Sequence, residues 1–327
     1  MARIALVHDV AGVAKVQAEL LRSAGHEVDE IALPHLGATW RWPAKGIAMP
    51  FRLAAYLPAI NRLRARKYDI VHIHWLSHGI VGVLSGREFF AQAHGSDLHL
   101  NLNNPVYRWI TRSVLRSAKK VFYVTPNLKT YLQGYADKLL YLPNPVDMRG
   151  IAAGFAPPTQ VAKVLIFTRL DPVKGVDIIF PAVEALQGWV ELTALDWGQL
   201  AGSYSKRYGS SVKFVPRVSH DQIGAFLQQF DVVIGQMRQG ILSLMEIEAL
   251  GAGRPLITGV NWDLYPEDPP PVLRAATTED IVAAVKRLAR ELLELSRLSR
   301  EGREWAVRNH SYAHHLKLLE DAYFDRT

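Results

Sequence analysis

Short, almost continuously apolar runs alternate with amphipathic stretches along the whole chain, and this alternation limits the fold more than any other feature. The apolar runs lie at residues 4–8, 28–33, 70–74, 89–93, 121–125 and 139–142, and the pattern restarts at 163–168, 191–195, 212–215, 232–234 and 255–258. Strands that are apolar on both faces are typical of parallel sheets covered by helices on both sides. We therefore expect an α/β fold of two doubly wound, Rossmann-like domains that face each other across a cleft.

Length and one break in composition predict where these domains divide. At ~150 residues per domain, a chain of 327 residues favours two, and the stretch 148–160, with Gly, Ala and paired Pro, is typical of a linker. We expect domains at 1–150 and 151–310, with a helix at 311–327 that packs back on the first. Ligands of such sheets bind at the carboxyl ends of the strands, so we expect the site in the cleft.

The amphipathic stretches between the apolar runs predict the covering helices. Long ones are expected over 13–23, 51–67 and 176–186, with further helices near 221–229, 242–250 and 279–323. No apolar run approaches the ~20 residues of a membrane span, and the first residues lack the long apolar stretch of a signal peptide. We expect a cytoplasmic protein.

The net charge of +7 is placed unevenly. Residues 1–147 hold 18 Lys and Arg against 10 Asp and Glu, whereas the remainder holds 20 against 21. A basic half suggests an anionic partner, although a solvated cationic surface gives the same count. Because aromatic and basic residues interleave here, we expect contact with an anionic membrane surface, peripheral on its inner face, and consider nucleic acid the weaker alternative. The residues expected in this contact are Trp42, Arg62, Arg64, Arg66 and Lys67.

Cysteine is absent from the chain, and histidine is abundant in its first half. Disulfides, thiolate metal sites and cysteine nucleophiles are therefore excluded. His72 and His74 share one face of their strand, but no acidic ligands stand at suitable spacing, so we expect no metal site. His94 follows a strand and precedes Gly95-Ser96-Asp97, which suits either a catalytic imidazole that Asp97 orients or a simple helix cap.

Two cations follow the first strand of the second half. Arg169 and Lys174 stand five residues apart on the loop between that strand and the helix after Gly175. Arg can grip a diphosphate through two hydrogen bonds and Lys as a point charge. The alternative is a loop with two solvated cations.

A second loop leads from a strand into a helix at 235–255. The N–H groups of Ile241 and Leu242 can cradle phosphate oxygens at the start of this helix. Glu246 and Glu248 are two residues apart on it, so they point in different directions, and only one can face the cleft. That carboxylate could accept hydrogen bonds from ribose hydroxyls.

Taken in order, these segments resemble the retaining GT-B glycosyltransferases of the family 4 type (group 1 glycosyltransferases). The resemblance covers almost the whole chain. Besides the loops above, it rests on the Gly12 loop, on Asp69-Ile70-Val71-His72-Ile73-His74-Trp75, on Ala93-His94-Gly95-Ser96-Asp97, on Leu142-Pro143-Asn144-Pro145-Val146-Asp147 and on Glu248-Ala249-Leu250-Gly251-Ala252-Gly253-Arg254-Pro255.

The resemblance assigns roles to single residues. Arg169 and Lys174 match the pair that binds the donor diphosphate, Glu248 the glutamate that holds the ribose, and His94 the histidine near the reacting sugar. Gly12 matches the donor-site loop that lets acceptor and phosphate approach the backbone. Such enzymes transfer a sugar from a nucleotide sugar, here expected to be a UDP- or GDP-sugar, to a hydroxyl acceptor that is lipid-linked or a polysaccharide in some members. They retain the anomeric configuration and need no metal or other cofactor. Their first domain binds the acceptor, so the resemblance implies that the five residues expected at a membrane surface could contact the acceptor instead.

One position departs from the family pattern. The first glutamate of the family's Glu-x7-Glu motif, which touches the donor sugar, falls at Gly240. Arg238 or Gln239 could substitute for it in a shifted loop. The departure keeps alternatives open: a non-catalytic GT-B-fold partner or a membrane- or RNA-associated binding protein, and a related epimerase or phosphorylase.

Overall fold

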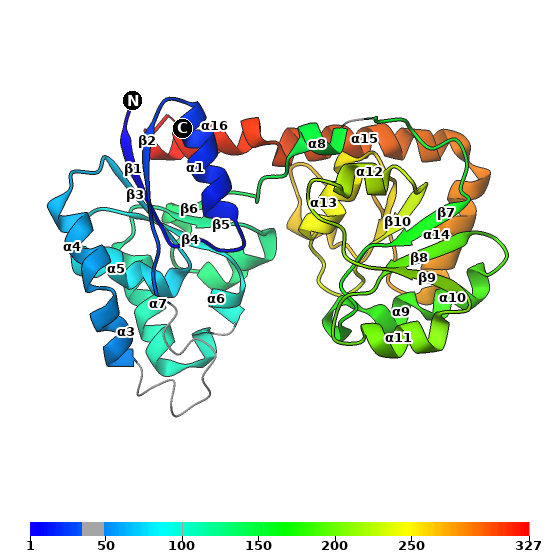
Figure 1. Ribbon diagram of the computed structural model, residues 1–327, viewed down its shortest axis with the longest axis horizontal. Coiled ribbons are helices and arrows are strands. Elements are labelled where there is room, and N and C mark those ends of the chain that lie inside the picture. The colour runs from blue at the N-terminus through cyan, green and yellow to red at the C-terminus, as the bar shows by residue number, and fades with distance from the viewer. Residues whose placement is uncertain (35–48, 100, 153, 327) are drawn as a thin grey trace. The chain divides into compact units, whose positions relative to one another are not determined.

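The computed structural model of the chain describes residues 1–34, 49–99, 101–152 and 154–326 (Figure 1). It divides into two compact units, one of Met1–Pro145 with His315–Thr327 and the other of Val146–His314. No helix within the described part is long and apolar enough to cross a membrane.

Unit 1 is built on a six-stranded parallel sheet in the order β2-β1-β3-β4-β5-β6. Its strands are β1 (Arg3–Val7), β2 (Glu27–Ile31), β3 (Ile70–His74), β4 (Phe90–Ala93), β5 (Val121–Tyr123) and β6 (Leu139–Tyr141). Its helices are α1 (Val13–Ser23), α3 (Met49–Ala55), α4 (Leu57–Ala65), α5 (Ile80–Ser85), α6 (Ser96–His99), α7 (Pro105–Ser117) and most of α16 (Tyr312–Tyr323). In the described part of this unit, 3-10 turns also occur at η1 (Leu76–Gly79), η2 (Asn101–Asn103), η3 (Pro126–Leu132) and η4 (Ala136–Lys138).

Both faces of this sheet are covered by apolar packing. One core lies under α4, α5 and α7 and includes Val71, Ile73 and Leu63. The other lies under α1 and α16 and joins Leu6 and Phe90 to Leu319, Ala322 and Tyr323. The burial on both faces is why these strands carry no polar alternation.

Unit 2 carries a second six-stranded parallel sheet, in the order β12-β11-β10-β7-β8-β9. Its strands are β7 (Lys163–Ile166), β8 (Glu191–Leu195), β9 (Val212–Val215), β10 (Val232–Ile234), β11 (Leu256–Thr258) and β12 (Leu273–Arg274). Its helices are α8 (Met148–Ala152), α9 (Val176–Ile179), α10 (Pro181–Leu186), α11 (Ala201–Tyr208), α12 (Ile223–Leu227), α13 (Leu244–Gly251), α14 (Thr278–Arg290) and α15 (Leu292–His310), with 3-10 turns η5 (Pro172–Lys174) and η6 (Trp262–Leu264).

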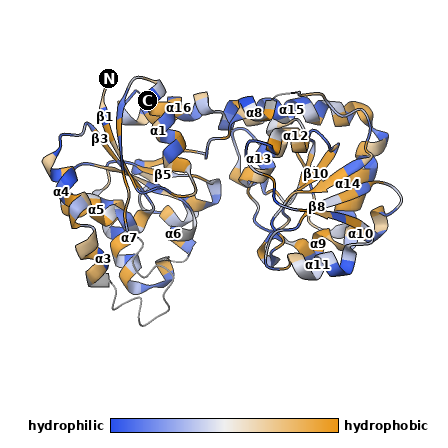
Figure 2. Cartoon of the chain, in the orientation of Figure 1, coloured by the Kyte–Doolittle hydropathy of each residue, from blue (hydrophilic) through white to orange (hydrophobic). Residues whose placement is uncertain are grey.

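The strand order of unit 2 fixes where a ligand can bind. The chain runs outward from β7 to β8 and β9, then returns to place β10 on the other side of β7. At such a reversal the loops after the two central strands separate and leave a crevice at their carboxyl ends. Figure 2 shows apolar residues on central strands such as β10 and a mixed surface on helices such as α15.

The predicted α/β fold of two doubly wound, parallel sheets is confirmed. The prediction of one long helix over 51–67 is wrong in one respect. The segment forms two helices, α3 and α4, which meet at Tyr56. Pro58 lies in the first turn of α4, where its missing N–H group is tolerated. Pro181 likewise divides 176–186 into α9 and α10. The helix α8 occupies the first part of the segment predicted to be a linker, and α11 was not predicted.

Candidate nucleotide-sugar site

The loop after β7 presents an arginine beside an aromatic ring. The Arg169 guanidinium is ion-paired with the Asp171 carboxylate and lies 5.8 Å from the centre of the Trp197 ring, on the loop after β8. Gly198 brings this second loop against the first, since a Cβ there would lie 2.6 Å from the backbone nitrogen of Leu170. Carboxylate and ring thus hold a guanidinium that remains half-exposed at the carboxyl edge.

Lys174 is tied to the loop after β10 on the other side of the reversal. Its Nζ donates to Oε1 of Gln236 at 2.9 Å and to Oε1 of Gln239 at 2.7 Å. The backbone also joins the loops, because the Met237 N–H donates to the Lys174 carbonyl at 2.9 Å. Burial lowers the pKa of Lys174. The two amide oxygens orient the ammonium group and, being neutral, leave its charge available to an anion.

Gln236 and Glu246 form the frame behind Lys174. Gln236 is fully buried, and its Nε2 donates to the Ile241 carbonyl at 2.7 Å, which turns Oε1 toward the lysine. Glu246, also fully buried, accepts from the Gln236 N–H at 3.1 Å and from both the N–H and the hydroxyl of Ser243 at 2.7 Å. Burial raises the pKa of Glu246.

Sequence reasoning missed this frame, although the spacing Ser243-x-x-Glu246 is a capping-box pattern that could have indicated it. As the two-residue spacing predicts, Glu248 points elsewhere. Its carboxylate lies 3.4 Å from Nδ1 of His220, and its side chain is 10% exposed. Burial raises the pKa of Glu248, and His220 opposes that rise. Glu248 is therefore a carboxylate that a ribose could still reach, whereas Glu246 is committed to the loop.

Gly240 has a conformational reason to be glycine in this fold. Its φ is +69°, and a Cβ would lie 3.3 Å from that of Asn261. The Gly240 carbonyl accepts from the Asn261 N–H at 2.9 Å, within a short parallel bridge. The nearby Leu242 N–H donates to the Tyr265 hydroxyl at 2.9 Å. This corrects the expectation that the Leu242 N–H serves a phosphate, because it already has a protein acceptor.

In unit 1, the half-buried His94 is paired with the buried His74. Its Nε2 lies 3.1 Å from Nδ1 of His74, whose ring stacks on His72 with centres 4.6 Å apart. Burial lowers the pKa of His72 and of His94 to about 3 and that of His74 well below its usual value. These imidazoles are neutral at pH 7, so they act as hydrogen-bonding groups.

Asp97 shapes the loop that carries His94. The carboxylate accepts backbone hydrogen bonds from Gly95 at 2.9 Å, His94 at 3.1 Å and Leu76 at 2.9 Å. Burial raises the pKa of Asp97 to about 6. The expectation that Asp97 orients an imidazole is replaced by this backbone role. Gly12 precedes α1 with a φ of +82° and has open space where a Cβ would stand.

Two sequence profiles match the chain. Residues 5–145 match the glycosyl transferase 4-like domain, and residues 181–321 match the glycosyl transferase-like domain. Together they span most of the protein. The chain belongs to the family 4 glycosyltransferases. Members of this family transfer a sugar from a nucleotide sugar. A search of curated protein sequences found no match to this chain.

Solved structures share the fold of this glycosyltransferase over its full length. Sucrose-phosphate synthase from Thermosynechococcus elongatus has a TM-score of 0.75 at 17% identity, covering 100% of this chain and 99% of its own. A glycosyltransferase from Rickettsia africae has a TM-score of 0.75 at 15% identity, covering 99% and 98%. Anabaena HepE, solved with UDP and glucose, has a TM-score of 0.70 at 13% identity, covering 98% and 99%.

The cations predicted to meet an acceptor or a membrane are partly engaged within the glycosyltransferase itself. Arg62 and Arg66 both pair with Asp29, at 3.1 and 2.9 Å, and Arg64 donates to the Leu84 carbonyl at 2.5 Å. Lys67 is exposed. Trp42 lies outside the described residues. Among those residues, no group of three or more His, Asp or Glu side chains is placed to hold a metal ion.

Proposed function

We propose that this glycosyltransferase moves a sugar from a UDP- or GDP-sugar to a hydroxyl acceptor with retention of configuration and without a bound metal. The observation that carries the proposal is the cation pair at the strand reversal of unit 2. Arg169 and Lys174 stand on the loop after β7, and Lys174 is held by neutral amides of the loop after β10. Two oriented cations at this position suit a diphosphate.

In the proposed reaction the sugar–phosphate bond breaks as the acceptor oxygen bonds to the same face of the sugar carbon. The acceptor's proton passes to an oxygen of the departing diphosphate, whose growing negative charge Arg169 and Lys174 stabilise. Glu248 accepts from the ribose hydroxyls, and His94 positions the transferred sugar or the acceptor. Gln239, whose amide oxygen already contacts Lys174, takes the place of the sugar-contacting carboxylate that Gly240 lacks.

The test is a thermal-shift panel of UDP, GDP, ADP and CMP. At a concentration 100 times its dissociation constant, one nucleotide should add ~2.7 kcal/mol of stability, which raises the midpoint by several degrees. Lys174→Ala should abolish this shift. Lys206→Ala, an exposed lysine on α11, is the matched control and should preserve it. A panel in which no nucleotide stabilises the protein, or in which the two variants behave alike, contradicts the proposal.

The second candidate function is a non-catalytic partner that kept the fold, which the missing carboxylate at Gly240 favours. Many true transferases slowly hydrolyse their donor without acceptor. The donor to test is the sugar conjugate of the nucleotide that stabilises the protein in the thermal panel. Release of sugar from this donor supports catalysis, whereas nucleotide binding without any release supports the non-catalytic partner.

We further propose a peripheral contact with an anionic membrane surface through unit 1. Trp109 on α7 is 62% exposed, and Arg112 and Arg116 lie on the exposed side of the same helix. Tryptophan at headgroup depth beside arginines suits such a surface. Co-sedimentation with vesicles containing phosphatidylglycerol should fall for Trp109→Ala and should be absent with pure phosphatidylcholine; equal binding to both contradicts it.

A further inference from the structure

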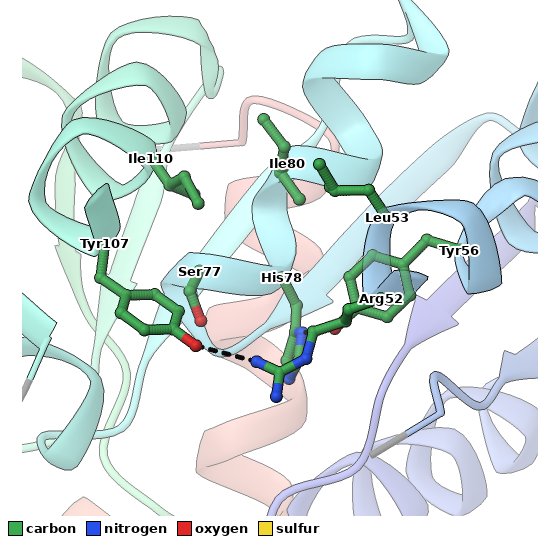
Figure 3. A pocket seen from close by; sticks show the side chains of 8 residues that line it. All are labelled: Arg52, Leu53, Tyr56, Ser77, His78, Ile80, Tyr107 and Ile110. Atoms are coloured by element: carbon green, nitrogen blue, oxygen red, sulfur yellow. Dashed lines mark hydrogen bonds between the residues drawn. The ribbon is translucent and has the colours of Figure 1, made fainter. Parts of the chain in front are cut away.

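In a small pocket of unit 1 the polar side chains are paired with one another. The pocket lies between α3, η1 and α7 (Figure 3) and has room for about one water molecule. Its Arg52 donates to the Tyr107 hydroxyl at 2.8 Å, and the Tyr56 hydroxyl lies 3.0 Å from Nδ1 of His78. His74 differs, because it is fully buried and one nitrogen of its ring has no partner in the described part of the chain. The proposed reaction gives His74 no role, and burying a polar group without a partner destabilises a fold.

His74 lies in the core of the sheet between two other imidazole rings. It is the last residue of β3 and pairs in register with Gln92 on β4. Its ring centre is 4.6 Å from that of His72 and 5.3 Å from that of His94, and both neighbours are stacked on it. Its Nδ1 lies 3.1 Å from Nε2 of His94. An apolar side chain would fill this space without leaving a nitrogen unpaired, so the hydrogen bond to His94 is what a histidine adds here.

The unpaired nitrogen shows where the proton of His74 lies. Burial holds the pKa of His74 well below its usual value, so the ring is neutral and has one N–H group and one lone pair. A proton on Nε2 would be a buried donor with no acceptor in the described part of the chain. A proton on Nδ1 is donated to His94 and leaves only a lone pair unpaired. Buried N–H groups without an acceptor are the rarer of the two in proteins, so Nδ1 carries the proton.

This arrangement determines the tautomer of His94. Because Nε2 of His94 accepts from His74, it has no proton, and the N–H group of the neutral ring is at Nδ1. Nδ1 of His94 has no hydrogen-bond partner among the described residues and, unlike Nε2 of His74, it is not sealed from solvent. The Asp97 carboxylate separately fixes the backbone that carries the ring. His94 therefore presents an N–H donor to solvent directly after β4.

We infer that His74 is a positioning residue for His94: its Nδ1–H donates to Nε2 of His94 and fixes the tautomer in which Nδ1–H of His94 donates to an oxygen of the transferred sugar. The contact with the sugar rests on the proposed function, whereas the tautomer does not. A ring fixed in this way accepts no hydrogen bond from the ligand. It therefore favours a hydroxyl or ring oxygen of the sugar over an ammonium group at the same place.

The test is the tautomer of His94, measured by long-range proton–nitrogen correlation NMR on the full chain isotope-labelled at its histidines. In the wild type, His74 and His94 should each be protonated at Nδ1; the resonances of His94 are identified by their loss in His94→Gln. His74→Phe keeps an aromatic ring but no donor, so the two nitrogens of His94 should move toward the averaged shifts of a free imidazole. His74→Asn keeps an N–H group at the same place on the side chain and should restore the wild-type pattern.

His72→Gln is the matched control. It removes the neighbouring buried ring and leaves the hydrogen bond between His74 and His94 in place, so the tautomer of His94 should not change. If His74 only packs, His74→Phe and His72→Gln should behave alike. A wild-type His94 protonated at Nε2, a mixture of its tautomers, or an unchanged pattern in His74→Phe overturns the inference. The first two outcomes are read from the wild type and do not depend on whether a variant folds.

Ligand arms separate this inference from the proposed function. The sugar conjugate of the nucleotide that stabilises the protein should shift the Nδ1 resonance of His94, and the nucleotide alone should not. Slow release of sugar from this donor should fall about tenfold in His74→Phe and stay near the wild-type rate in His74→Asn. The midpoint shift given by the nucleotide should persist in both, because Lys174 belongs to unit 2.

The two failures are distinguishable. A bound sugar conjugate that leaves the Nδ1 resonance of His94 unshifted overturns the sugar contact. If no nucleotide binds, the proposed function fails and the sugar contact falls with it, whereas the wild-type tautomer of His94 still decides the role of His74.

Discussion

Acid should unfold unit 1 through its buried histidines before it affects unit 2. His72, His74 and His94 are held neutral by burial, with pKa values of about 3 for His72 and His94 and a pKa well below the usual value for His74. In the unfolded chain each recovers a pKa near 6.5 and takes up a proton as the pH falls. Between these values the unfolded state binds more protons than the folded state, so stability falls with falling pH.

The magnitude follows from the proton uptake. From pH 7 to pH 5, each imidazole that stays neutral when folded lowers the free energy of unfolding by about 2 kcal/mol, or about 6 kcal/mol for three. Asp97 acts in the opposite direction, because its pKa is raised to about 6 in the folded state. The folded protein takes up a proton there as the pH falls, and this raises the free energy of unfolding by about 1 kcal/mol. The net loss of about 5 kcal/mol is a large part of the ~5–15 kcal/mol typical of a domain.

Native-state hydrogen exchange measures this loss segment by segment. The opening free energy of β3 should fall by about 5 kcal/mol between pH 7 and pH 5, and that of β8 in unit 2 should change less. His72→Gln should reduce the pH-dependent part in β3 by about 2 kcal/mol. His220→Asn, which replaces a histidine whose side chain is 92% exposed, should leave it unchanged. A decrease in β3 below about 1 kcal/mol would refute the reasoning.

Three further outcomes are expected. Glu246→Gln places an amide N–H against the backbone N–H of either Gln236 or Ser243. It should lower the stability of unit 2 by about 3 kcal/mol in urea unfolding. A midpoint within experimental scatter of wild type would show that the loop tolerates the amide. Gly253→Ala puts a Cβ 2.1 Å from Cε2 of Phe155 at a φ of +68°, so it should lower the thermal midpoint more than Gly202→Ala, which has open space. Tyr323→Phe removes the hydroxyl that lies 2.7 Å from Nδ1 of His72 and should cost about 1–3 kcal/mol, with unit 1 alone affected in hydrogen exchange.

The elements with strong local patterns could be predicted from the sequence, and their partners could not. The periodicity of 13–23 gives α1 with its bounds, and the apolar run 70–74 gives β3, because both patterns are local. Lys174 meets Gln236 only because β10 lies beside β7, although 62 residues separate the two. Strand order depends on packing between distant segments, which no local window contains.

The surface cations show the same limit. Arg62 and Arg66 form a basic run in the sequence, which favours a partner outside the protein. In the fold, Arg62 on α4 and Arg66, the residue after α4, both reach Asp29 on β2. The Tyr68 hydroxyl donates to the same carboxylate at 2.6 Å. A run of basic residues shows only how charge is distributed along the sequence. The net charge of a surface depends also on which acidic side chains the fold brings beside the basic ones.

The return of α16 to unit 1 has a consequence for how the chain folds as it is synthesised. Unit 2 is continuous from Val146 to His314 and can close its core once those residues have left the ribosome. Unit 1 begins first and finishes later, because Leu319, Ala322 and Tyr323 cover one face of its sheet. Until they arrive, Ile4, Leu6 and Phe90 lie beneath an incomplete cover, so the nascent first unit is the part of this protein that chaperones should hold longest.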